Sequence, residues 1–166
     1  MLEITRKHGI PIFEDDCYVD LRFTGEDVTS IHSLDDSGQV MYVGSFSKVI
    51  APGVRMGYMV APEELTLRAM SFKGGGGVNQ LAAMAIEEYL KHEMYPHIEE
   101  QNRSLVVKRD AMLASLGENF GDAASWSKPE GGLYVWLELP EGTDLAALQV
   151  ALVGQLATSY FELRGL

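Results

Sequence analysis

The segment from Gly44 to Arg55 is the feature of this sequence that most constrains its fold. It reads Gly-Ser-Phe-Ser-Lys-Val-Ile-Ala-Pro-Gly-Val-Arg and begins at the end of the apolar run Val40–Gly44. A short apolar run without polar alternation is typical of a strand that is covered on both faces. Because α/β sheets bind ligands at the ends of their strands, Lys48 in this segment is a candidate functional residue.

A second apolar run, Ile10–Phe13, precedes another group of polar residues. Asp15 and Tyr18 follow it, three positions apart, which is a spacing that lets both side chains reach one planar ring. A third run, Met56–Val60, ends at an Ala-Pro pair. We therefore predict three strands, two of which are followed by polar side chains suited to a site.

The remaining pattern alternates between helical and extended segments, which predicts the α/β class or a split of α/β and α+β parts. A turn is expected at 35–38 and a helix that starts at 62–64. Two helices are expected after 74–77, and the second has apolar residues at helical spacing over 94–116. A strand over 133–139 and an amphipathic helix over 144–156, whose leucines face inward, complete the expected elements.

The long helix is the natural boundary between two parts of the chain. We expect residues 1–92 to form part of a larger sheet domain, residues 93–120 to form a linking helix and residues 121–166 to begin a smaller C-terminal domain. No internal repeat is visible in the sequence.

Composition excludes several classes of function. The formal net charge of −11 disfavours a nucleic-acid surface, because a phosphate polyanion would be repelled over most of the protein. The single cysteine, Cys17, leaves no internal disulfide framework and fits a reducing compartment. The sequence shows neither a signal peptide nor an apolar run of membrane-spanning length, so we expect a cytoplasmic protein without a membrane partner.

The side chains at the two strand ends make up the set that holds pyridoxal phosphate. The amine of Lys48 suits its aldehyde, and the carboxylate of Asp15 would keep its pyridine nitrogen protonated so that the ring draws electrons from the substrate. Arg55, with Ser45 and Ser47, would bind the phosphate through charge-assisted hydrogen bonds. Each residue alone has an ordinary surface or loop interpretation, so the prediction rests on their combination.

Other conspicuous residues favour structural interpretations. The run Gly74–Gly77 lacks the Gly-Lys-Ser/Thr ending of a phosphate loop and is typical of a connector. The four histidines lack the spacing of a metal site, so no bound metal is expected. Cys17 is interpreted as a small packing residue and not as a nucleophile. Trp126 and Trp136 are expected in the core.

These motifs resemble the class I/II aminotransferase family of fold type I pyridoxal-phosphate enzymes, especially its branch of 2-aminoadipate-type aminotransferases. The resemblance extends from about residue 8 to about residue 140. Its motifs are Asp15-x-x-Tyr18, Ser45-Phe46-Ser47-Lys48 with Ala51 to Tyr58, Asn102-Arg103, Lys108-Arg109-Asp110, and Lys128-Pro129-Glu130-Gly131-Gly132 with Leu133 to Trp136.

The resemblance implies an enzyme that transfers an amino group from an amino acid to a 2-oxo acid. It implies that Lys48 is the Schiff-base lysine and the proton-transfer base, and that Asp15 pairs with the pyridinium nitrogen. It further implies that Tyr18 binds the ring hydroxyl and that Ser45, Ser47 and Arg55 hold the phosphate. A homodimer with active sites at its subunit interface is also implied.

The sequence departs from the family pattern at both ends. Family members are much longer, and neither the residue that stacks on the cofactor ring nor the arginine that clamps the substrate carboxylate has a counterpart here. Arg164 is a poor substitute for that arginine, and residues 158–166 do not follow the family pattern, which suggests a truncation or a reading-frame scar. We therefore expect residues 1–166 alone not to transaminate.

Alternatives remain open at this point. A β-lyase of the same fold would share every motif. A sensory domain of a GntR-type transcription regulator would bind the cofactor to switch the regulator's affinity for DNA. A remnant without function is a third interpretation.

Overall fold

The computed structural model describes residues 1–152, which fall into two compact units. The first unit contains Met1–Met112 and Pro129–Tyr134, and the second begins with Leu113–Lys128 and continues from Val135. The long helix α4 (Met94–Phe120) belongs to both units. Within the described residues, no helix combines the length and the apolarity needed to cross a membrane.

The first unit holds the sheet and most of the helices. Its elements are α1 (Leu2–His8), β1 (Ile12–Asp15), η1 (Val19–Leu21), η2 (His32–Leu34), β2 (Val40–Ser45), η3 (Pro52–Val54), β3 (Gly57–Val60), α2 (Glu63–Ser71), α3 (Gln80–His92) and the first part of α4. The three predicted strands and the predicted helices of this unit are thus confirmed, with β1 and β3 shifted by one or two residues.

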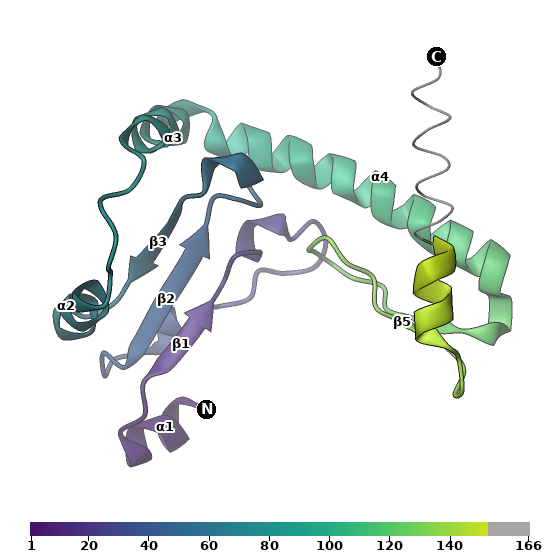
Figure 1. The fold of residues 1–166 in the computed structure, drawn as a ribbon, viewed down its shortest axis with the longest axis horizontal. Helices are drawn as coiled ribbons and strands as arrows, with labels where there is room; N and C mark the ends of the chain where they lie inside the picture. The colour runs from purple at the N-terminus through teal and green to yellow at the C-terminus, as the bar shows by residue number, and fades with distance from the viewer. Residues whose placement is uncertain (153–166) are drawn as a thin grey trace. The chain divides into compact units, whose positions relative to one another are not determined.

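The sheet has the order β1-β2-β3 (Figure 1). Strands β1 and β2 are parallel, with Asp15 beside Val43, whereas β3 runs antiparallel to β2, with Gly57 beside Ser45. The carboxyl ends of β1 and β2 and the start of β3 therefore meet at one edge. The polar residues singled out in the sequence follow these ends.

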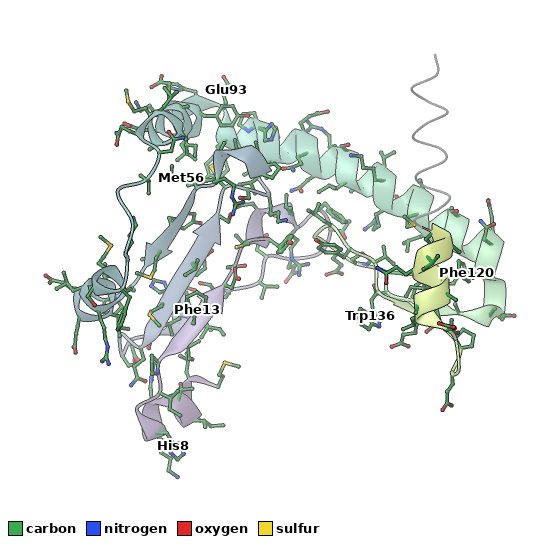
Figure 2. The ribbon with its side chains drawn as sticks, viewed as in Figure 1. His8, Phe13, Met56, Glu93, Phe120 and Trp136 are labelled. Atoms are coloured by element: carbon green, nitrogen blue, oxygen red, sulfur yellow. The ribbon has the colours of Figure 1, made fainter. Side chains whose placement is uncertain are left out.

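The prediction that these strands are covered on both faces is wrong for the described chain. Phe13 in β1 is 61% exposed (Figure 2), and Tyr58 and Val60 in β3 are also exposed. Both β1 and β3 are edge strands of a sheet of only three. Their apolar pattern suits a sheet with more neighbours than the described residues supply.

The connection between the parallel strands contains two 3₁₀ turns in place of the usual α-helix. The carboxylate of Glu14 accepts hydrogen bonds from the backbone N–H groups of Ile31 and His32, each at 2.8 Å. Asp35 accepts from the N–H groups of Gln39 at 2.7 Å and Val40 at 3.0 Å. Two side chains thus hold the ends of a connection that lacks a helix of its own.

A small core lies behind the polar edge. Leu21, Val49 and Ile98 are buried together, and Phe46, Ile50, Met94 and Leu105 pack against them. These residues come from the segment after β1, the segment after β2 and α4. The predicted apolar face of α4 is confirmed over its first half, while Met112 is 52% exposed. The core fixes both polar segments on one helix.

The second unit is smaller. It contains the end of α4, η4 (Gly121–Ala123), and the antiparallel pair β4 (Ser125–Trp126) and β5 (Leu137–Glu138), followed by a helix from residue 145. The strand predicted over 133–139 is therefore much shorter than expected. Leu133 and Tyr134 belong to the first unit.

Two core predictions in the second unit are wrong. Trp136 is 72% exposed (Figure 2), with its indole N–H directed to Glu138 Oε1 at 3.4 Å. Leu145 and Leu152 are likewise more than half exposed, and Leu148 is 36% exposed, because the described residues provide no surface that covers this helix. Trp126 is half-buried. Leu156, Arg164 and residues 158–166 lie outside the described residues.

Candidate active site

The turn after β2 gathers an arginine and two serines. Ser45 Oγ accepts a hydrogen bond from the N–H of Ser47 at 3.2 Å, and Arg55 Nη1 lies 3.4 Å from Ser47 Oγ. The same arginine nitrogen donates to the carbonyl oxygen of Pro52 at 3.4 Å. The three predicted phosphate ligands are thus brought into one chain of contacts.

The backbone of Arg55 takes a left-handed conformation to make these contacts. Its φ is 49° and its ψ is 43°, and it is the one non-glycine residue in the described chain with a positive φ. Left-handed backbone costs a non-glycine residue free energy, so it persists only where the surroundings enforce it. Here Arg55 caps the C-terminus of η3, and the carbonyl oxygen of Met56 then accepts a hydrogen bond from Phe46 N at 3.1 Å.

Lys48 follows in the same turn and faces the segment after β1. Its Nζ lies 5.6 Å from the centroid of the Tyr18 ring. Lys48 is half-buried and Tyr18 is 38% exposed. An ammonium at this distance from an aromatic face is attracted by the ring quadrupole. The structure therefore brings the candidate lysine and phenol together.

Asp15 lies at the carboxyl end of β1, where it is paired with Val43 of β2. Its Oδ1 accepts a hydrogen bond from the thiol of Cys17 at 2.8 Å. That hydrogen bond, together with burial and the nearby carboxylate charges, raises the pKa of Cys17. A thiol held in its protonated form is a poor nucleophile, which agrees with the expectation that Cys17 is not a nucleophile.

A tyrosine cluster beside the site was not predicted from the sequence. Tyr42 donates a hydrogen bond to Asp16 Oδ2 at 3.1 Å, and its ring centroid lies 6.3 Å from that of Tyr58. Burial, with the charge of Asp16 next, raises the pKa of Tyr42 well above its usual range. The Tyr58 ring lies over Gly44, where a side-chain carbon would collide with it. A glycine inside an apolar strand was the available signal.

The Gly131-Gly132 motif joins the same neighbourhood. Gly131 pairs with Arg22 in an antiparallel bridge, and the carbonyl oxygen of Glu130 accepts from the N–H groups of Phe23 and Thr24. The Tyr134 ring meets the Tyr18 ring edge to face, with 6.3 Å between centroids. Residues 130–134 of this motif thus contact the segment that carries Tyr18.

The donor set at this edge fits a planar cofactor with an aldehyde, a basic ring nitrogen and a phosphate. The amine of Lys48 and the carboxylate of Asp15 come from neighbouring parallel segments, and Ser47 and Arg55 form a cationic, hydroxyl-bearing cradle next to them. A guanidinium beside hydroxyls suits a phosphate. Among residues 1–152, no three His, Cys, Asp or Glu side chains gather as a metal site would require.

Comparison with known proteins places the chain in a family. The family model of aminotransferase class I and II matches residues 1–161. The chain belongs to the class I and II aminotransferase family. This membership confirms the resemblance drawn from the motifs and the assignment of the fold to pyridoxal-phosphate-dependent transferases.

Individual curated proteins match most of this chain. The aromatic-amino-acid aminotransferase 1 of Thermococcus litoralis is 35% identical over 87% of this chain and 35% of its own length. The transcriptional regulator NorG of Staphylococcus aureus, of the helix-turn-helix type, is 36% identical over 89% of this chain and 34% of its own length. The chain thus spans about a third of the curated relatives that it matches.

The fold is shared with solved family structures. The α-aminoadipate aminotransferase LysN from Thermus thermophilus superimposes with a TM-score of 0.81 at 31% identity, covering 87% of this chain and 39% of that one. That structure was solved in complex with N-(5'-phosphopyridoxyl)-L-leucine. The likeness confirms that the chain is a partial piece of the aminotransferase fold.

Proposed function

We propose that this chain is the lysine-bearing part of a pyridoxal-phosphate-dependent aminotransferase, which moves an amino group from an amino acid to a 2-oxo acid. The observation that carries the proposal is the edge where Lys48 faces Tyr18 and Arg55 contacts Ser47. These residues stand in the motifs that resemble the family. Family membership supports the reaction class.

Pyridoxal phosphate, when bound, supplies a conjugated ring that withdraws electrons from the substrate's α-carbon. The amine of Lys48 would be the group that holds the cofactor through its aldehyde, and when free it would serve as the base that moves a proton at the substrate α-carbon. Lys48 is half-buried in the turn after β2, and the next residue, Val49, is buried in the core and fixes the backbone beside the lysine. Proximity of this kind supplies much of an enzyme's rate.

Asp15 and Tyr18 orient the ring from the β1 side. Since Cys17 donates to Asp15 Oδ1, the other oxygen is left for the protonated pyridine nitrogen. A fixed carboxylate at that nitrogen stabilises the charge that develops in the transition state. The phenol of Tyr18 would hydrogen-bond the ring hydroxyl of the bound cofactor.

The phosphate is held from the β2 side. Arg55 offers paired N–H donors, and the hydroxyls of Ser45 and Ser47 complete the cradle. We further propose that the full-length protein is a cytoplasmic homodimer. Analytical ultracentrifugation of that protein tests the dimer.

A second candidate is favoured by the relatives. Besides NorG, the helix-turn-helix transcriptional regulator YisV of Bacillus subtilis is 34% identical over 82% of this chain. The chain would then be the cofactor-binding sensory part of a regulator. An upstream winged-helix segment in the full reading frame, with cofactor binding but no turnover, would favour this candidate. A β-lyase of the same fold would release ammonia from its substrate without consuming a 2-oxo acid.

The test uses the full-length protein. Titration with pyridoxal phosphate followed by borohydride reduction should label Lys48, and Lys48→Ala should abolish both the label and the 2-oxoglutarate-dependent consumption of amino acids. Lys91→Ala is the matched control, because Lys91 lies on α3 and pairs with Glu88 at 2.9 Å. Persistent labelling of the active site in Lys48→Ala would refute the assignment.

A further inference from the structure

Two amide side chains interrupt the apolar face that α4 presents to the core. Met94, Ile98 and Leu105 pack against the buried cluster, and Gln101 and Asn102 lie between the last two of them. Both amides are largely shielded from solvent. Polar groups in such a place cost free energy unless they make hydrogen bonds, so their contacts indicate their role.

Each amide fastens a different segment to the helix. Gln101 Nε2 donates to the carbonyl oxygen of Lys48 at 2.9 Å. Asn102 Nδ2 donates to the carbonyl oxygens of Asp20 at 2.9 Å and Arg22 at 3.1 Å. All three partners are acceptors only, so the amide groups must present their nitrogens to them. Gln101 and Asn102 are adjacent on α4, and they therefore hold the Lys48 turn and the segment after Tyr18 at the same point of the helix.

Of the three carbonyl groups, that of Lys48 lies in a turn, that of Asp20 lies within η1 and that of Arg22 directly follows η1. In the Lys48 turn, the N–H groups of Ile50 and Ala51 both bond to the carbonyl oxygen of Phe46. The Lys48 carbonyl takes its partner from α4. Backbone groups shielded from water need such partners.

The amide oxygens of Gln101 and Asn102 differ from the amide nitrogens in their contacts. Within the described residues, Gln101 Oε1 and Asn102 Oδ1 are buried without a hydrogen-bond partner. A buried acceptor without a donor destabilises the fold. The side chains therefore gain their stabilisation only through the nitrogens that hold the two segments.

We propose that Gln101 and Asn102 are positioning residues that fix the Lys48 turn and the Tyr18 segment at one spacing on α4. The role of that spacing in catalysis rests on the proposed function. A helix is a stiff spacer, and adjacent residues on it hold their partners in a constant relation. The 5.6 Å between Lys48 Nζ and the Tyr18 ring is the geometry they maintain.

Amide hydrogen exchange in the full-length protein without cofactor tests the two contacts separately. Gln101→Met keeps the length of the side chain but removes its donor, and should speed exchange at Ile50 and Ala51 about tenfold. Asn102→Leu should instead speed exchange at Phe23 and Thr24. Glu100→Gln is the control, because Glu100 is exposed and pairs with Arg103.

Turnover of the loaded enzyme provides a readout that general loosening would not give. Each variant should lower kcat about tenfold or more with KM within about twofold, because a displaced lysine slows proton transfer without weakening substrate binding. The loss in the double variant should fall short of the product of the single losses, since both act on one spacing. If Asn102→Leu does not fold, Asn102→Ser tests the same donor.

The outcomes separate this proposal from the proposed function. Faster exchange at both segments in each single variant, or at neither, would overturn the positioning role, as would single losses of kcat that multiply in the double variant. These exchange measurements need no cofactor. A protein that shows the crossed exchange pattern yet never transaminates would refute the aminotransferase assignment and the catalytic part of this proposal, but leave the two contacts established.

Discussion

Gly131 lies directly against the backbone of Leu21. A side-chain carbon on Gly131 would stand 2.7 Å from the Leu21 carbonyl oxygen and 2.9 Å from Arg22 Cα. The neighbouring Gly132 donates its N–H to the same carbonyl oxygen at 2.8 Å. This contact packs residues 129–134 against the segment that follows Tyr18. The space at Gly131 does not admit a larger residue.

Gly131→Ala should therefore lower the free energy of unfolding by about 1–3 kcal/mol, the usual range for an overpacked site. Urea unfolding of the full-length protein measures it. Gly53→Ala is the control, because no atom lies within 4 Å of the corresponding position and the backbone there is not left-handed. Equal stability of the two variants would show that the 129–134 segment moves away at little cost.

Asp15→Asn should slow transamination while cofactor remains bound. The substitution preserves shape but removes the charge opposite the pyridine nitrogen, so the barrier should rise by about 3 kcal/mol. Single-turnover kinetics and cofactor titration measure the two effects. The control is Asp27→Asn in the exposed loop after β1. Near-normal turnover in Asp15→Asn would mean that another carboxylate serves the ring.

Arg55→Ala should weaken cofactor affinity about tenfold or more, because hydrogen bonds to charged groups contribute ~1.5–3 kcal/mol each. Arg55→Lys should recover only part of the loss, since an ammonium lacks the planar fork of a guanidinium. Arg68→Ala on α2 is the control. Equilibrium titration with pyridoxal phosphate distinguishes these cases, and unchanged affinity in Arg55→Ala would leave Arg55 a surface residue.

Asp35 should make the fold sensitive to acid. The hydroxyl and N–H of Ser37 and the N–H groups of Gln39 and Val40 hold the pKa of Asp35 far below its usual range. Because the folded pKa is lowered, its stabilisation is complete above the unfolded pKa of about 3.9 and is lost as pH falls toward the folded value. Asp35→Asn should therefore reduce stability at pH 7 and flatten its decline below pH 4. Parallel acid-unfolding curves for both proteins would contradict this.

The sequence pattern predicted the elements of the sheet because their cause is local. Apolar runs such as Val40–Gly44 are bounded by turn residues, and the polar groups at their ends follow from strand direction alone. The same reasoning selected Lys48, Tyr18, Ser47 and Arg55 as candidate site residues, and the structure brings them together in pairs.

The sequence could not predict contacts that depend on tertiary placement. Gln101 and Asn102 look like ordinary polar residues of a helix, and only the packing of α4 brings them to Lys48 and Asp20. The predictions of which residues are buried failed for a different reason. Trp136 has the apolar character of a core residue, but burial also requires a partner surface, which the described residues do not supply.

The connection between β1 and β2 also governs how fast this sheet assembles. The parallel strands can pair only after residues 16–39 are ordered, and that segment has no α-helix that could form early by itself. The entropy of closing such a loop is lost before the strand contacts compensate for it, which slows folding. The carboxylates of Glu14 and Asp35 act as local clasps that shorten the effective loop. We therefore expect the rate of sheet formation to depend on two side chains to which the proposed chemistry assigns no role.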